Sequence, residues 1–155
     1  MRDDEDGSVV DGQTGLPNRE GWEAVLEAEE QRSRRHGGTH GLVLIRLEPV
    51  GTDGAPAEEA AGAVARVLRE TDLLARIDDR TFGILALYCE RLETVVGRLR
   101  ASLEGAGVQL AALIDARSAG TDLLATWAAM VNGSEPATPT ARHIAFVASS
   151  RLSLN

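Results

Sequence analysis

The sequence predicts an α/β fold, an α+β sandwich in which helices flank a central mixed sheet. Short, continuously apolar stretches alternate with longer stretches in which apolar residues recur at helical spacing. Their order is helix, strand, helix, two strands, helix, strand, helix and strand, which is typical of a ferredoxin-like sheet covered by helices. With 155 residues, 43% of them hydrophobic, the chain is long enough to bury a core as one domain.

The first half of the chain contains the clearest elements. A cluster of turn-forming residues ends at Asn18, whose side chain can cap a helix over 19–36. The continuously apolar run at 42–47 is typical of a buried central strand. Pro56 suits the first turn of a helix that we expect to reach Glu70.

The second half begins with a predicted β-hairpin. Apolar runs at 73–77 and 82–88 flank the polar sequence DDRT, which fits a four-residue tip. The remaining expected elements are a helix over 90–103, a strand over 108–114, a turn at 115–117, a helix capped by Thr121 and ending near Val131, and a last strand over 143–148.

Composition and charge exclude several classes of function. A net charge of −8 disfavours non-specific binding to nucleic acid or to an anionic membrane. No apolar stretch approaches the roughly 18 residues of a membrane span, and the acidic first residues do not resemble a signal peptide, so we expect a cytoplasmic protein. Cys89 lies in an apolar run and is expected to be buried and unreactive. The three histidines are far apart, so we expect neither a metal site nor a cofactor.

Three stretches resemble segments of the GGDEF family, the diguanylate cyclases. DGQTGLPNR at 11–19 resembles the DxLTGLPNR motif that precedes the family's first helix. LRETDLLARI at 68–77 is similar to the LRESDLxARY segment that leads into the signature hairpin, and LLATWAAM at 123–130 resembles the LLxxADxAMY helix. The resemblance implies a nucleotidyl-cyclase-like fold.

The resemblance covers residues 11–148, with 1–10 as a charged lead-in and 149–155 as a tail. The family uses the first motif as a turn that fixes its first helix. We therefore expect changes in it to reduce stability without a direct chemical effect. The residues concerned are Asp11, Thr14, Gly15 and Asn18.

The signature that gives the family its name is replaced in this chain. Where the family has Gly-Gly-Asp-Glu-Phe, this chain has Asp78, Asp79, Arg80, Thr81 and Phe82. The family's third signature position binds a divalent metal through a carboxylate, and the matching residue is Arg80. A second metal carboxylate, at the end of the first strand, matches Arg46. A divalent cation needs anionic oxygen ligands, which guanidinium groups cannot supply.

Other parts of the family's catalytic apparatus are also missing. The loop GTDGAPAEE, at 51–59, lacks the residues with which the family reads guanine, and the chain has no lysine to hold phosphates. Phosphoryl transfer depends on positioning and charge stabilisation. We therefore expect a degenerate GGDEF domain, a pseudoenzyme. A residual enzyme that acts on another nucleotide is the least expected alternative.

A second site of the family has a counterpart here. In the family, an RxxD motif five residues before the signature binds cyclic di-GMP, together with an arginine from the next helix. Arg69 and Asp72 stand in that register, and Arg98 is the best match in the next helix. Arginine can donate in pairs to phosphate or guanine, and aspartate can accept from guanine N–H groups.

The resemblance thus implies a bacterial signal-transduction domain that acts as a cyclic di-GMP receptor and has a protein partner or forms a homodimer. In the alternative, Arg69 is a solvated helix end. The domain is then a protein-interaction or dimerisation module that binds no nucleotide.

Arg46 and Arg80 allow two interpretations. They hold an anion directly where the family holds metal, or they pair with Asp78, Asp79 or Glu48 in an ion-pair cluster. We expect the cluster, because opposite charges close together at a surface form such pairs readily.

Overall fold

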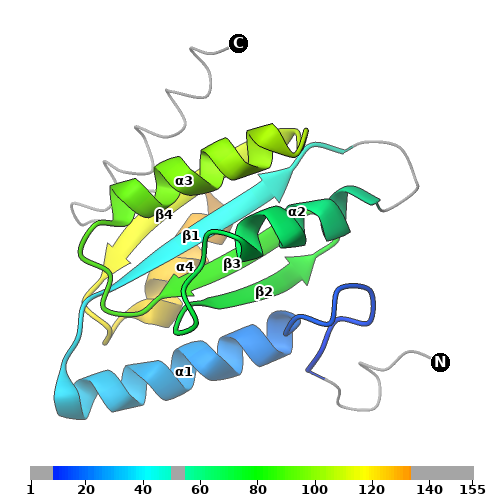
Figure 1. The fold of residues 1–155 in the computed structure, drawn as a ribbon. Helices are drawn as coiled ribbons and strands as arrows, with labels where there is room; N and C mark the ends of the chain where they lie inside the picture. Colours follow the sequence, from blue (N-terminus) through cyan, green and yellow to red (C-terminus); the bar gives the residue numbers. More distant parts are fainter. Residues whose placement is uncertain (1–8, 50–54, 134–155) are drawn as a thin grey trace.

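The computed structural model describes residues 9–49 and 55–133, which form a four-stranded sheet with helices on both faces (Figure 1). The elements in chain order are α1 (Arg19–His36), β1 (His40–Leu47), α2 (Ala55–Ala65), β2 (Leu73–Asp78), β3 (Thr81–Ala86), α3 (Leu92–Gly105), β4 (Leu110–Ser118) and α4 (Leu123–Asn132). The strand predicted over 143–148 lies outside the described residues. None of the described helices combines the length and apolar character that a membrane span requires.

The strand order is β2-β3-β1-β4, and all three pairings are antiparallel. β1 occupies a central position, as its continuously apolar sequence predicts, and its residues 42–45 are fully buried. We expected a mixed sheet. The described sheet is antiparallel because the β2–β3 hairpin presents β3 to β1, and β4 joins the other side of β1 in the antiparallel sense.

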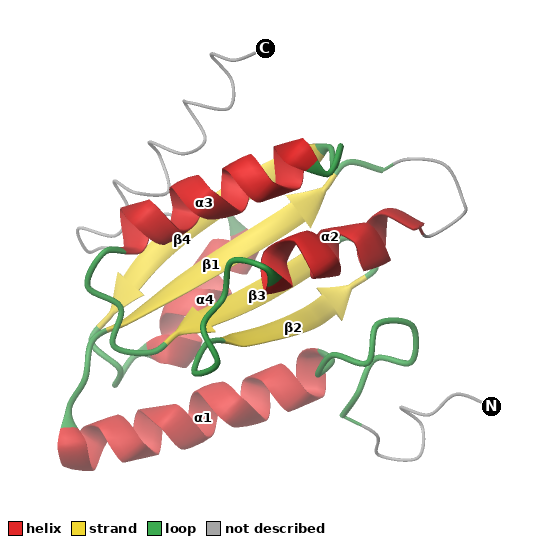
Figure 2. Ribbon diagram, viewed as in Figure 1, coloured by secondary structure: helices red, strands yellow, loops and turns green. Residues whose placement is uncertain are grey.

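Two helical layers cover the sheet, α1 and α4 on one face and α2 and α3 on the other (Figure 2). The first layer centres on Trp22 and Trp127, whose ring centroids lie 4.9 Å apart in an edge-to-face arrangement. Successive residues of β1 contribute to the two layers alternately. This burial on both faces explains why residues 42–45 of β1 are all apolar.

The DGQTGLPN motif forms a hydrogen-bonded turn before α1. The Asp11 carboxylate accepts hydrogen bonds from the Thr14 backbone N–H (2.8 Å) and hydroxyl (2.7 Å). Gly15 has a φ of 76°, a left-handed conformation that favours glycine. The Asn18 side chain accepts from the Gly21 N–H (3.0 Å), which confirms it as the N-cap of α1. These contacts give the motif a structural role.

The ends of α2 and β4 differ most from the prediction. α2 ends at Ala65 rather than Glu70, because the residues that follow form a turn in which the Arg69 N–H donates to the Asp72 carboxylate. The turn predicted at 115–117 is wrong, since these residues belong to β4. Asp115 is buried opposite Val43 in the sheet.

The beginning of α4 also differs from the prediction. The N-cap position belongs to Asp122, not Thr121, and the Asp122 side chain makes no cap hydrogen bond, whereas the Leu124 N–H donates to the Glu30 carboxylate (2.7 Å). The Ser118 hydroxyl donates to the Asp122 carboxylate (2.5 Å), which draws that side chain toward β4 instead.

His40, at the beginning of β1, is fully buried against α1 and the segment after β3. Its Nδ1 accepts from the Tyr88 N–H (2.9 Å), and its Nε2 lies 2.9 Å from the Glu29 carboxylate. Burial lowers the pKa of His40, and the attraction of Glu29 opposes this only in part. The unfolded chain therefore takes up this proton more readily than the folded domain does.

We expect the free energy of unfolding to be greatest above roughly pH 6.5 and to fall as the pH drops to about 5, because protons then favour the unfolded chain. Urea unfolding at pH 7.5, 6.5 and 5.5 measures the effect. His40→Gln should reduce the loss between these pH values, whereas His36→Gln, at an exposed histidine, should leave it unchanged. If the free energy of unfolding fell equally with pH for the parent and His40→Gln, the assignment of this pH dependence to His40 would be contradicted.

Candidate functional site

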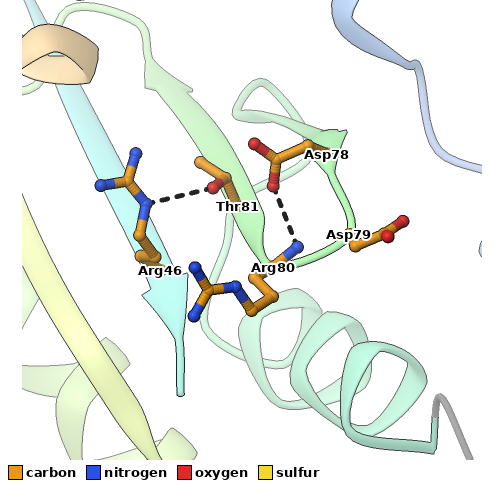
Figure 3. A pocket seen from close by; sticks show the side chains of 5 residues that line it. All are labelled: Arg46, Asp78, Asp79, Arg80 and Thr81. Carbon is orange, nitrogen blue, oxygen red and sulfur yellow. Dashed lines mark hydrogen bonds between the residues drawn. The ribbon is translucent and has the colours of Figure 1, made fainter. Parts of the chain in front are cut away.

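The tip of the β2–β3 hairpin and the end of β1 enclose an open hollow of about 480 Å³ (Figure 3). The residues that line it are Arg46, Asp78, Asp79, Arg80 and Thr81. The structure thus brings Arg46 together with four of the five residues of the replaced signature. The fifth, Phe82, is fully buried between the sheet and α2–α3, where packing explains it.

Strand register places these residues together. Arg46 lies directly opposite Thr81, because the end of β1 meets the beginning of β3. The Leu47 N–H donates to the Arg80 carbonyl (2.8 Å), and Arg80 Nη1 donates to the Leu47 carbonyl (3.3 Å). Asp78 pairs with Thr81, so the hairpin tip has two residues rather than the four that we expected. These bonds hold Arg80 next to the end of β1.

The charged groups of the hollow do not form the ion-pair cluster that we expected. Arg46 Nε donates to the Thr81 hydroxyl (3.3 Å), a neutral acceptor. The Asp78 carboxylate accepts from the backbone N–H of Arg80 (2.9 Å) instead of its guanidinium, and the Asp79 carboxylate is directed away from both arginines (Figure 3). Across residues 9–49 and 55–133, no carboxylate lies within ion-pair distance of either guanidinium.

The residues at this site do not fit the divalent metal that the resemblance implies. Within the described chain, no group of three or more histidine, cysteine, aspartate or glutamate side chains could hold a metal ion. Both positions that would supply carboxylates carry guanidinium groups, from Arg46 and Arg80. A cation beside the end of β1 would be repelled by both guanidinium groups, and the carboxylates of Asp78 and Asp79 alone do not complete a metal site.

The RxxD counterpart lies at the opposite end of the hairpin, in the turn before β2. Arg69 Nη2 and Nε donate to the Asp72 carboxylate at 2.7 and 3.1 Å, and Nη2 also donates to the Leu87 carbonyl (2.8 Å). The Arg69 side chain is 51% exposed, whereas that of Asp72 is 2% exposed. Arg69 therefore has an outer edge in solvent, while Asp72 is covered.

Arg98 lies on the exposed side of α3. Among the described residues, it makes neither a hydrogen bond nor an ion pair with Arg69 or Asp72. The structure therefore joins Arg69 and Asp72 directly, while Arg98 makes no bond to either of them among the described residues.

Sequence reasoning missed the role of Arg76, which is 8% exposed within the apolar strand β2. Arg76 Nη1 donates to the Gln13 side chain (2.5 Å) and to Asp11 (3.3 Å), and Nη2 donates to the Asp79 carbonyl (3.0 Å). The residue ties the DGQTGLPN motif to the hairpin tip. A single arginine within an apolar strand is the sequence signal that marks it, because a buried charge needs partners.

Asp11 is the ionic partner of Arg76 in this cluster. Burial alone would raise the pKa of Asp11, but the hydrogen bonds from Thr14 and the charge of Arg76 outweigh it, and the pKa lies below its ordinary value. The carboxylate is thus held in its charged form.

No protein-family model and no curated protein matches the chain. Solved structures do match its fold. The diguanylate cyclase SiaD from Pseudomonas aeruginosa, solved with its activator SiaC, is 26% identical with a TM-score of 0.59. The alignment covers 73% of this chain and 49% of SiaD, so the chain spans about half of that protein.

The alignments with two further structures cover nearly the whole length of those chains. A diguanylate cyclase (DGC) protein from Thermotoga maritima has a TM-score of 0.65 at 14% identity, over 79% of this chain and 95% of that one. The GGDEF domain of DgcB from Caulobacter crescentus, solved with c-di-GMP, has a TM-score of 0.60 at 14% identity, over 82% and 92%. All three structures share the fold of this chain, which therefore has a GGDEF-like fold.

Proposed function

We propose that the chain is a non-catalytic signalling domain of GGDEF-like fold. The observation that carries the proposal is the presence of guanidinium groups, from Arg46 and Arg80, at the two positions that match the metal carboxylates of the family. Phosphoryl transfer in such a site depends on metal ions that neutralise developing charge. A domain without that neutralisation acts by binding.

For the ligand, we propose cyclic di-GMP, bound with Arg69. The Nη1 group of Arg69 donates to no acceptor among the described residues, and half of the side chain is exposed. This outer edge is free to donate to a phosphate or to guanine. Asp72 fixes the guanidinium plane, and Arg98 supplies a second positive charge from α3. A direct bond from guanine to Asp72 requires the Arg69–Asp72 pair to open.

Isothermal titration calorimetry with cyclic di-GMP tests this ligand. We expect binding by the parent chain. Arg69→Ala should bind at least about tenfold more weakly, because a charge-assisted hydrogen bond is lost. Arg66→Ala is the matched control, since Arg66 is exposed near the same turn and its side chain makes no hydrogen bond in the described structure. The ligand assignment fails if the parent gives no heat, or if Arg69→Ala binds as tightly as the parent.

A second candidate is a protein-interaction module that binds no nucleotide. The observation in its favour is the mutual pairing of Arg69 with Asp72 and Leu87, which accounts for both motif residues as parts of a turn. The relative SiaD was solved with a protein activator. A parent chain that gives no heat with cyclic di-GMP but self-associates in sedimentation velocity would support this candidate.

A further inference from the structure

We propose that Arg46 and Arg80 form a binding site for a phosphate-class anion that requires no divalent cation. Arg46 lines the hollow from the end of β1 and Arg80 from the tip of the β2–β3 hairpin, and the Leu47–Arg80 backbone and side-chain bonds hold them beside each other. This site is separate from the Arg69 turn and does not depend on what that turn binds.

The electrostatics of the hollow near the end of β1 favour an anion. Two positive groups line the same hollow, and within the described residues neither has a carboxylate at ion-pair distance. Like charges in such proximity repel, so an anion between them is stabilised by both. The guanidinium groups keep their charge at any physiological pH.

The two guanidinium groups also offer hydrogen-bond donors to a ligand. Each guanidinium is anchored by one bond to a neutral acceptor, Arg46 Nε to the Thr81 hydroxyl and Arg80 Nη1 to the Leu47 carbonyl. In the described structure, both terminal nitrogens of Arg46, and Nε and Nη2 of Arg80, donate to no protein acceptor. The site therefore offers oriented donors whose side chains already have defined positions, which is favourable for binding.

Two carboxylates, those of Asp78 and Asp79, also line the hollow, but neither is directed toward the guanidinium groups, so their repulsion of an anion is limited. Asp78 accepts from the Arg80 N–H, and its charge is directed to the hairpin backbone. Asp79 is directed away from the guanidinium groups (Figure 3). The positive and negative groups therefore lie on different sides of the hollow, with the guanidinium groups near the end of β1.

The number of donors and the volume indicate the class of ligand. A phosphate carries up to two negative charges and several acceptor oxygens, which match two separate guanidinium groups better than one carboxylate does. The volume of about 480 Å³ exceeds that of a bare ion and suits a phosphorylated small molecule.

Calorimetric titration with pyrophosphate in EDTA tests the proposal, with sodium chloride at equal ionic strength as the blank. We expect binding by the parent chain. Arg46→Gln and Arg80→Gln should each bind at least about tenfold more weakly, because each loses charge-assisted hydrogen bonds. The double variant should show no binding. Arg66→Gln, which removes an exposed arginine elsewhere, should bind like the parent.

Thermal unfolding without anion separates loss of binding from loss of fold. Each substitution removes one of two like charges but also one hydrogen bond to a neutral acceptor, so these effects oppose each other and the midpoint of the variants should stay close to that of the parent. With pyrophosphate the parent midpoint should rise, and the double variant should not respond. The proposal is overturned if the parent fails to bind in EDTA, if binding appears only with magnesium, or if the double variant binds like the parent.

Discussion

Trp22→Ala is expected to lower the free energy of unfolding by about 3–5 kcal/mol, the usual cost of removing a large aromatic side chain from a core. Trp22 is fully buried, and its ring meets that of Trp127 edge to face. A Cβ atom at Gly83 of β3 would lie only 2.9 Å from atoms of both rings, so the indoles fill this space closely. Total stabilities of about 5–15 kcal/mol make such a loss large.

Urea unfolding followed by circular dichroism measures this loss, and Trp22→Phe is the matched control. The indole Nε1 of Trp22 has no hydrogen-bond partner among the described residues, so phenylalanine removes no hydrogen bond. We therefore expect a clearly smaller loss for Trp22→Phe than for Trp22→Ala. Equal losses for the two variants would show that ring packing does not account for the contribution of this residue.

The sequence predicted correctly the elements for which it contains clear local signals, and α1 and β1 are examples. α1 was predicted at its observed bounds, because Asn18 caps one end and glycines follow the other. β1 was predicted because a continuously apolar run of this length fits a strand buried on both faces. In both cases, local chemistry and the tertiary environment favour the same structure.

Predictions failed where tertiary contacts override the local pattern. The apolar residues after Ala65 continue a helical pattern, yet Val67 already bonds to the Val64 carbonyl in a tighter turn, and Asp72 captures the Arg69 N–H. Asp115 was predicted in a turn because it follows the strand predicted over 108–114. Its place in β4 follows from pairing with β1, which no local signal reveals.

The position of the candidate site could be predicted from the sequence, but its electrostatics could not. The match of Arg46 and Arg80 to carboxylate positions follows from alignment with the family motifs, and strand register brings the two residues to one hollow. Whether they pair with Asp78 depends on side-chain directions. In the structure, Asp78 bonds to the hairpin backbone, which leaves the guanidinium groups without an ionic partner in the described residues.

The second large expected effect is the absence of cyclase activity. A diguanylate cyclase lowers its barrier through metal ions that align two nucleotides and neutralise their phosphates. At the matching positions, Arg46 and Arg80 repel a divalent cation and provide no ligand for it. The carboxylates in the hollow do not restore the site, because Asp78 accepts from the hairpin backbone and Asp79 is directed away from both guanidinium groups (Figure 3).

Incubation of the folded chain with GTP and magnesium or manganese, with chromatographic analysis of the products, tests the central claim most directly. An active diguanylate cyclase under the same conditions shows that the assay detects product. We predict that the chain forms no cyclic di-GMP above a sample without protein. Formation of cyclic di-GMP by the folded chain would contradict the account that guanidinium groups have replaced its metal ligands.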